Sequence, residues 1–135
     1  MLILASASSA RRKLLEQTCI PYESMVSGVD EDKIHHADPK ILVQLLAEAK
    51  ARAISRKLFD IEGSQSWPSG IKFVLGCDSM FEFQGEVLGK PRDKNIAISR
   101  LEKLSGGSGV LHTGHALLFI FTDNPESTFL LIISR

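Results

Sequence analysis

Three short segments of the sequence place polar side chains where a phosphate group or a cation could bind. The first begins at Leu4, where an apolar stretch is followed by serines and then by Arg11 and Arg12. A strand that leads directly into a helix presents unpaired backbone N–H groups and the positive end of the helix dipole. Serine hydroxyl and arginine guanidinium groups would add donors that suit phosphate. Taken alone, however, the segment is better interpreted as a serine-capped surface helix with solvated arginines.

The second segment is centred on Asp78. This residue follows the apolar run 71–77, which is typical of a strand buried on both faces. Ligands of α/β proteins usually bind where such strands end. A carboxylate at that point could hold a divalent cation or accept a proton from water. The alternative is an aspartate that caps the next turn, and we expect the neighbouring Cys77 to belong to the core rather than to act as a nucleophile.

The third segment contains Lys90, which precedes a proline. Proline favours an extended backbone at the residue before it, so Lys90 would approach a ligand from a fixed direction. Lys50 is a further candidate cation, but it lies within a predicted amphipathic helix. A solvated helical lysine is the better interpretation of Lys50 when it is considered alone.

These residues lie among alternating predicted strands and helices. We expect strands at residues 2–5, 22–27, 71–77, 110–122 and 129–133, a hairpin of 81–83 with 86–88, and helices at 10–18, 39–58 and 94–104. Ser8 or Ser9 would cap the first helix, and Asp38 and Asp93 the other two. The residues expected on the buried faces of these helices are Leu14, Leu15, Leu42, Leu45, Leu46, Ala49, Ala53, Ala97, Leu101 and Leu104. The alternation predicts a single α/β domain, of mixed α+β type, over residues 1–135.

The composition limits the classes of partner. The chain has 135 residues, 44% of them hydrophobic, and 16 basic residues balance 16 acidic ones. A zero net charge argues against binding a nucleic acid polymer or an anionic membrane by bulk charge, whereas a small anion needs only a few converging cations. No apolar run reaches the ~20 residues that span a bilayer, and two cysteines are too few for a disulfide framework. We therefore expect a cytoplasmic protein.

Together these segments resemble the Maf family of nucleoside triphosphate pyrophosphatases. The likeness is carried, in order, by LASASSARRKLL, the acidic turn VDE, LAEAKA, GCDSMFEFQGEVLGKP and LSGGSGVLHTGHAL. The resemblance implies a Maf/inosine-triphosphatase-like fold, with a central mixed sheet flanked by helices, and a homodimer. Nothing after about Phe119 resembles the family, so we expect the C-terminal portion of its fold to be missing.

The resemblance also implies an activity, the hydrolysis of a nucleoside triphosphate at its α-phosphorus to the monophosphate and pyrophosphate. It implies a divalent metal, Mg²⁺ or Mn²⁺, and a role in removing non-standard nucleotides. By position, Asp78 would be the general base, and Glu31 would hold the metal alone or with Asp78. The residues that would bind the triphosphate are Ser6, Ser8, Arg11, Arg12, Lys50 and Lys90, and Ala10 and Ser79 fall at positions that vary with the base.

The sequence leaves several alternatives open. Compared with the commoner pattern of the family, one residue is added before the arginine pair, so either Arg11 or Arg12 could enter the site. The base could be that of dTTP and UTP, a methylated base, or one of a broad range. The shortened end favours a second hypothesis, a non-catalytic nucleotide-binding protein with a role in cell division. A structural domain without a ligand is the third.

Overall fold

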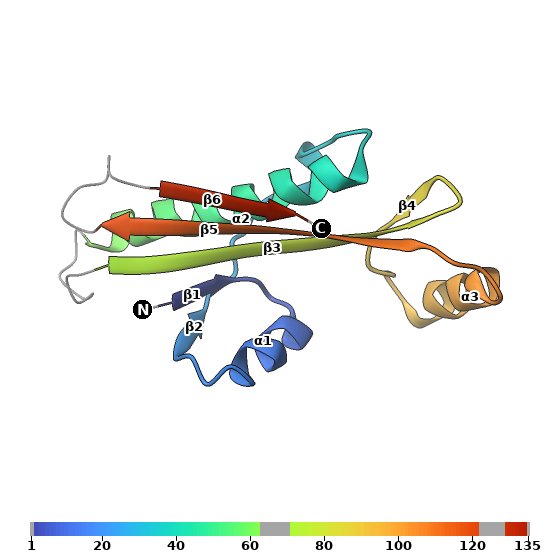
Figure 1. The fold of residues 1–135 in the computed structure, drawn as a ribbon, viewed down its shortest axis with the longest axis horizontal. Coiled ribbons are helices and arrows are strands. Elements are labelled where there is room, and N and C mark those ends of the chain that lie inside the picture. The colour runs from blue at the N-terminus through green and yellow to red at the C-terminus, as the bar shows by residue number, and fades with distance from the viewer. Residues whose placement is uncertain (1, 63–70, 122–128, 135) are drawn as a thin grey trace.

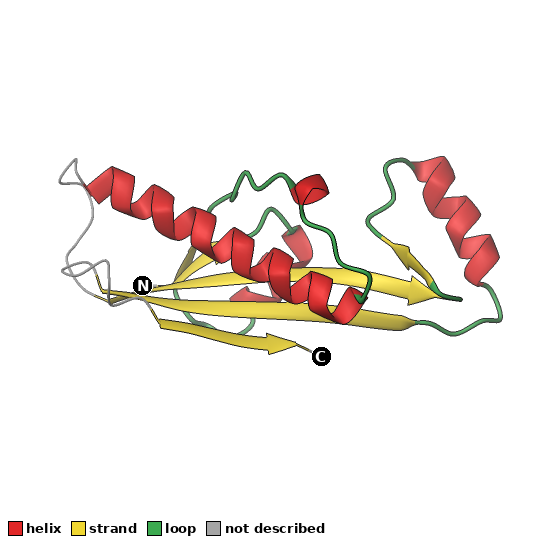
Figure 2. Ribbon diagram, turned by 90° about the horizontal axis from the view of Figure 1, so that it is seen from above, coloured by secondary structure: helices red, strands yellow, loops and turns green. Residues whose placement is uncertain are grey.

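The computed structural model describes residues 2–62, 71–121 and 129–134. In this part of the chain a mixed β-sheet is covered on one face by a long helix (Figure 1; Figure 2). The elements, in chain order, are β1 (Leu2–Ala5), α1 (Ser9–Glu16), β2 (Tyr22–Ser24), the 3₁₀ turn η1 (Glu31–Lys33), α2 (Pro39–Glu62), β3 (Ile71–Phe83), β4 (Glu86–Leu88), α3 (Lys94–Leu104), β5 (Val110–Phe121) and β6 (Phe129–Ser134). The expected α/β class, with a mixed sheet and flanking helices, is confirmed.

The strands lie in the order β2-β1-β3-β5-β6, and β4 pairs with β3. β1 is parallel to β2 and β3, whereas β5 is antiparallel to both β3 and β6. β1 ends where Ala5 pairs with Gly76, but β3 and β5 remain paired as far as Glu82 and Val110. The two long strands therefore form a ribbon that extends past β1 and carries β4 and α3, an extension called the arm below (Figure 1).

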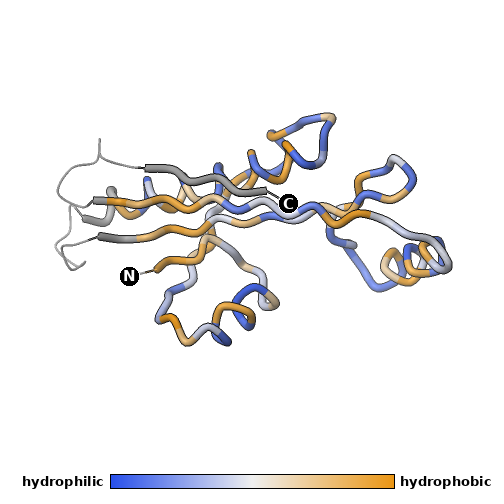
Figure 3. Tube along the Cα trace, viewed as in Figure 1, coloured by the Kyte–Doolittle hydropathy of each residue, from blue (hydrophilic) through white to orange (hydrophobic). Residues whose placement is uncertain are grey.

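The core lies between α2 and the sheet. Its buried residues are Ile3, Ala5, Ala47, Ala51, Ile54, Leu58, Val74, Ala116, Leu118 and Ile120. Full burial of one large aliphatic side chain contributes about 1.5–3 kcal/mol, so this layer contributes substantially to the stability of the fold. Figure 3 shows β1 and the neighbouring parts of β3 and β5 as hydrophobic, and the middle of the two long strands as more hydrophilic. The change marks the place where the core ends.

Local signals predicted the helix starts correctly. The Ser8 side chain accepts a hydrogen bond from the backbone N–H of Arg11 and caps α1. Asp93 accepts one from the backbone N–H of Ile96 and caps α3. These caps satisfy N–H groups that have no partner within the helix. The strand bounds differ more from the prediction. β2 is shorter than predicted, and β3 is one continuous strand that includes residues 81–83, which were predicted as a separate strand of a hairpin.

The predicted buried faces of the helices are wrong in part. α1 and α3 bury none of their residues, and Leu14 and Leu101 are 64% and 68% exposed. On α2 the expected Leu45 is 39% exposed, and the buried face instead includes Val43 and Ala47. The reason is close approach: a Cβ on Gly76 would overlap the Ala47 carbonyl, so the helix places small residues against the sheet at this point. Leu46, which was also predicted, is 1% exposed, so that part of the prediction is confirmed. No described helix is both long and apolar enough to cross a membrane.

Candidate functional site

A lysine and two carboxylates from three separate elements meet at the edge of the core. Lys50 Nζ of α2 lies 2.7 Å from Glu31 Oε1 of η1 and 3.0 Å from Asp78 Oδ1 of β3. The side chains of Lys50 and Asp78 are only 12% and 10% exposed, and that of Glu31 is 50% exposed. The interpretation of Lys50 as a solvated lysine is therefore wrong. We call this group the Lys50 cluster.

Asp78 occupies the cluster because of its place in β3. Side chains alternate between the faces of a strand, so Val74, Gly76 and Asp78 point toward α2. Asp78 does not end its strand, as we expected, but pairs with Gly114 within a β3 that continues to Phe83. β3 continues because β5 still pairs with it there. The strand that does end here is β1, whose last residue pairs with Gly76, two residues before Asp78. Because Asp78 lies within a strand, the alternative that it caps a turn is excluded.

One edge of β3 has a stretch at this point that no described strand pairs with. β1 pairs with residues 73–76 of β3, and β4 pairs with residues 81–83. β5 pairs with the opposite edge over its whole length, so β1 and β4 must share the first edge. Residues 77–80 therefore lie in a break between β1 and β4, which we call the edge gap. Asp78 and Ser79 both belong to it.

The surroundings of Lys50 favour its charged ammonium form. Burial alone would lower the pKa of Lys50, but hydrogen bonds and charge interactions with Glu31 and Asp78 outweigh burial and raise the pKa. Within the described residues, Asp78 Oδ2 is buried and has no hydrogen-bond partner. A buried polar atom without a partner is costly, since most such atoms in proteins are paired. This oxygen is therefore available to a water molecule or a cation.

A second polar group lies on the opposite face of β3. Arg11 Nη2 donates a hydrogen bond to Ser79 Oγ over 3.0 Å, and Ser79 Oγ lies 3.1 Å from Thr113 Oγ1 of β5. A guanidinium group has only donors, so the Ser79 oxygen accepts from Arg11 and can direct its own proton to Thr113. Sequence reasoning missed Thr113, because only the register of β5 against β3 brings it next to Ser79.

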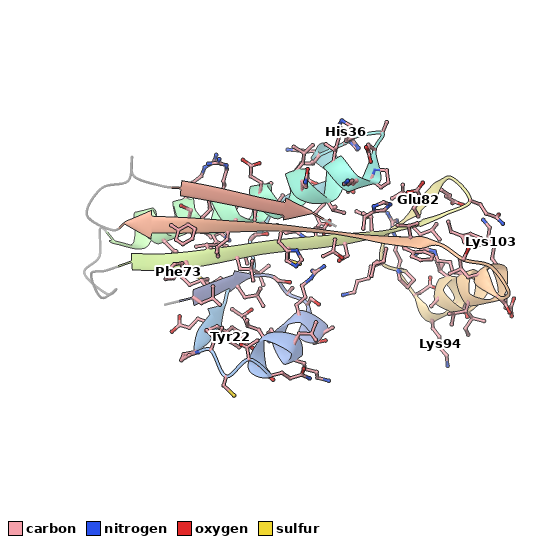
Figure 4. All side chains as sticks on the ribbon, viewed as in Figure 1. Tyr22, His36, Phe73, Glu82, Lys94 and Lys103 are labelled. Carbon is pink, nitrogen blue, oxygen red and sulfur yellow. The ribbon has the colours of Figure 1, made fainter. Side chains whose placement is uncertain are left out.

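The structure separates the two arginines. Arg11 reaches β3, whereas Arg12 is exposed and lies near β2. The backbone carbonyl of Arg12 and the carboxylate of Glu16 both accept from the Tyr22 hydroxyl, which lies between β2 and α1 (Figure 4). A step of one residue along the helix explains the difference, since adjacent helical residues do not share a face. Of the two, Arg11 is the arginine placed beside the edge gap.

The serines of the first loop organise it through hydrogen bonds. Ser6 Oγ accepts from the backbone N–H of Ser8 over 3.1 Å, and the Ser24 hydroxyl donates to the Ser6 carbonyl over 3.0 Å. Ser6 is only 7% exposed. The loop is thus fixed directly after β1, where it leads into the helix that carries Arg11. Binding of a triphosphate by Ser6 and Ser8 stays a prediction.

Lys90 and Ala10 are exposed, and no contact ties either to the Lys50 cluster. Lys90 lies in the segment between β4 and α3, and its ammonium has no ion-pair partner within the described residues. Its neighbour Gly89 is held by Arg100, which donates to the Gly89 carbonyl. Lys90 therefore belongs to the arm. The roles proposed for Lys90, Ala10 and Arg12 stay predictions.

A hollow of about 220 Å³ lies beneath α1, on the same face as Arg11. Its lining is mostly apolar and includes Leu75, Cys77 and His115. Burial raises the pKa of the Cys77 thiol. Burial and the charge of Arg11 lower the pKa of His115. Cys77 is 5% exposed, so the expectation that it belongs to the core is confirmed.

The two cysteines should differ sharply in reactivity. Cys19 is exposed and Cys77 is buried. Because the thiolate is the reactive form and burial disfavours it at Cys77, a disulfide reagent such as DTNB should label Cys19 quickly and Cys77 only after unfolding. Cys19→Ser should remove the fast phase and leave the slow one. Equal rates for the two thiols in the folded protein would contradict this arrangement.

Removal of the Thr113 hydroxyl should weaken the second polar group. Thr113→Val keeps the shape of the side chain but leaves Ser79 without its partner on β5. We expect the free energy of unfolding, measured with urea, to fall by about 1 kcal/mol. Thr113→Ser keeps the hydroxyl and should lose less. If the serine variant loses as much as the valine variant, the methyl group rather than the hydrogen bond is what stabilises the site.

Comparison with known proteins places these motifs in a family. The family model described as Maf-like protein matches residues 1–129. The match continues beyond Phe119, where we expected the likeness to stop.

Among the described residues, no group of three or more histidine, cysteine or acidic side chains is arranged to hold a metal ion.

Curated relatives carry the name nucleoside triphosphate pyrophosphatase. One from Synechococcus sp. (strain CC9311) is 58% identical over 118 residues, which cover 87% of this chain and 58% of the relative. One from Synechococcus sp. (strain WH7803) is 57% identical with the same coverage. One from Prochlorococcus marinus (strain MIT 9303) is 51% identical over 128 residues, which cover 95% of this chain and 63% of the relative. The chain spans about three-fifths of the length of these relatives, and on the strength of the family match it belongs to the Maf family.

Proposed function

We propose that the protein is a nucleoside triphosphate pyrophosphatase, in which water attacks the α-phosphorus and pyrophosphate leaves. The observation that carries the proposal is the buried Oδ2 of Asp78, which has no partner among the described residues and lies beside a lysine that holds the other oxygen of the same carboxylate. The names of the relatives support the same activity. The substrate would be a free nucleotide rather than a nucleic acid polymer, and a homodimer in the cytoplasm remains our expectation.

Asp78 would act as the general base. In the ligand-free protein Lys50 donates a hydrogen bond to Oδ1, which orients the carboxylate so that Oδ2 is the oxygen that would accept a proton from water. A positioned carboxylate of this kind typically contributes 10²–10⁴-fold to a rate. The base would therefore be set by the fold before the substrate arrives.

The substrate would be held at the edge gap. A triphosphate carries roughly four negative charges, and positioning with charge neutralisation is most of what phosphoryl chemistry needs. Asp78 and Arg11 approach the gap from opposite faces of β3, so a ligand that crosses this edge can reach both. Arg11, the loop serines Ser6 and Ser8, and Lys50 would supply positive charge and donors, with Arg12 and Lys90 as further cations. Ala10 and Ser79 would contact the base.

A divalent cation fits the residues present. Glu31 and Asp78 offer two carboxylates, which meet around a single positive charge, the ammonium of Lys50. Mg²⁺ commonly binds through one or two carboxylates together with substrate phosphates and water, so a site with only two protein ligands suits it. When bound, Mg²⁺ or Mn²⁺ would neutralise charge that develops on the phosphate oxygens.

The test is a panel of ribonucleoside and deoxyribonucleoside triphosphates incubated with the purified protein and Mg²⁺ or Mn²⁺ in ¹⁸O-labelled water. We expect pyrophosphate and a nucleoside monophosphate that carries the label, because water would attack the α-phosphorus. Label in the pyrophosphate, or no pyrophosphate from any nucleotide, would overturn the proposal. Calorimetric binding of a triphosphate without turnover would favour the non-catalytic alternative.

A further inference from the structure

We propose that Lys50 is a resident counter-ion that occupies the place of the divalent cation until a triphosphate draws it away. The cation and the triphosphate would then bind as a coupled pair rather than independently. The inference rests on the proposed function, because it takes these two ligands from it. It assigns to Lys50 a role distinct from simple attraction of phosphate.

The geometry of the Lys50 cluster carries the inference. The ammonium lies 2.7 Å from Glu31 Oε1 and 3.0 Å from Asp78 Oδ1, so it bridges the two carboxylates that would hold the cation. With 12% of its side chain exposed, Lys50 has little freedom to swing into water. A cation that binds both carboxylates must therefore approach this ammonium closely or displace it.

Electrostatics give the direction of the effect. A buried carboxylate needs a compensating positive charge, and Lys50 supplies it in the absence of a ligand. A divalent cation that enters while Lys50 stays in place meets a like charge at close range, where the local dielectric is low. The phosphates of a substrate offer Lys50 new partners of opposite charge. Each ligand therefore reduces the cost of binding the other, which is positive thermodynamic coupling.

The same geometry explains why the cluster tolerates the absence of ligand. Three charges of alternating sign, Glu31, Lys50 and Asp78, form a closed set with only Asp78 Oδ2 unpartnered among the described residues. The carboxylates are thus held together before the cation arrives. The ammonium therefore keeps the two carboxylates together and also competes with the cation for them.

Binding of Mn²⁺ alone, followed by its electron paramagnetic resonance signal without any nucleotide, tests the proposal. Lys50→Met should bind Mn²⁺ about tenfold or more tightly than the unmodified protein, because the competing charge is gone. Lys50→Arg keeps the charge and should bind as weakly as the unmodified protein. Lys40→Met is the matched control, since Lys40 is an exposed lysine of the same helix, and it should change nothing. Equal or weaker binding by Lys50→Met overturns the proposal.

Loss of Lys50 leaves Asp78 without a partner, so Lys50→Met has a second readout. If this variant is unfolded without metal, Mn²⁺ should restore its circular dichroism spectrum, and failure to do so also counts against the proposal. In the unmodified protein, Mn²⁺ with tripolyphosphate should raise the melting temperature by more than the sum of the two separate effects. Turnover enters none of these measurements, so a failed activity assay and a failed coupling experiment are distinguishable.

Discussion

Asp78→Asn is expected to lower the rate of pyrophosphate release by about 10²–10⁴-fold, the usual contribution of a positioned base. Asparagine has the same size as aspartate, and its oxygen can still accept the hydrogen bond from Lys50. It cannot take a proton from water, because the unpartnered Oδ2 is replaced by an NH₂ group. The measurement is the initial rate of pyrophosphate release at saturating triphosphate, with the affinity for the nucleotide determined separately by calorimetry.

Asp32→Asn is the matched control for this change. Asp32 is adjacent to Glu31 in η1, but it is exposed and lies outside the Lys50 cluster. It should keep the activity of the unmodified protein. If Asp78→Asn is as active as Asp32→Asn, Asp78 is not the base, and the proton acceptor must be sought elsewhere.

Gly76→Ala is expected to cost about 3 kcal/mol or more of the free energy of unfolding, at the upper end for overpacked cores. A Cβ on Gly76 would overlap the Ala47 carbonyl and lie 3.0 Å from Ala51 Cβ. A backbone carbonyl cannot turn aside as a flexible side chain can, so α2 would have to move away from the sheet. Since whole domains are stable by only ~5–15 kcal/mol, the change threatens the fold.

Urea unfolding measures this effect, with Gly89→Ala as the control. A Cβ on Gly89 meets nothing within 4 Å, and Gly89 is not in the left-handed region, so its replacement should change stability by less than about 0.5 kcal/mol. Activity gives an independent check, because a displaced α2 would carry Lys50 away from Asp78. An unchanged urea midpoint for Gly76→Ala would contradict the close packing of α2 on β3.

The parts of the fold that could be predicted from the sequence are those set by local chemistry. Ser8 and Asp93 cap their helices as expected, because capping depends only on residues within one turn. The buried face of α2 could be predicted only in part, because it also depends on glycines of the sheet, such as Gly114, where a Cβ would overlap the backbone of Val43. Hydrophobic spacing predicted Leu46 correctly, but it also favoured Leu45, which is 39% exposed, and it missed Ala47.

The same distinction holds for the site. Asp78 could be singled out from its apolar strand, but the end of that strand could not, because pairing with β5 extends it. Lys50 read alone is an ordinary helical lysine, and only the tertiary fold brings it to Glu31 and Asp78. Whether Arg11 or Arg12 faces β3 depends on the residue at which α1 begins, and the residue added before the arginine pair left that start uncertain.

The edge gap has a mechanical consequence. β6 pairs with β5 as far as Gly114, the partner of Asp78, so among the described strands only β3 and β5 join the arm to the rest of the sheet at Ser79 and Met80. Two-stranded ribbons twist more strongly than wider sheets. Asp78 lies at this joint, whereas Lys90 lies out on the arm. The distance between Asp78 and Lys90 therefore depends on the local twist of these two strands. Substitutions that alter this twist would change the distance without contacting either side chain.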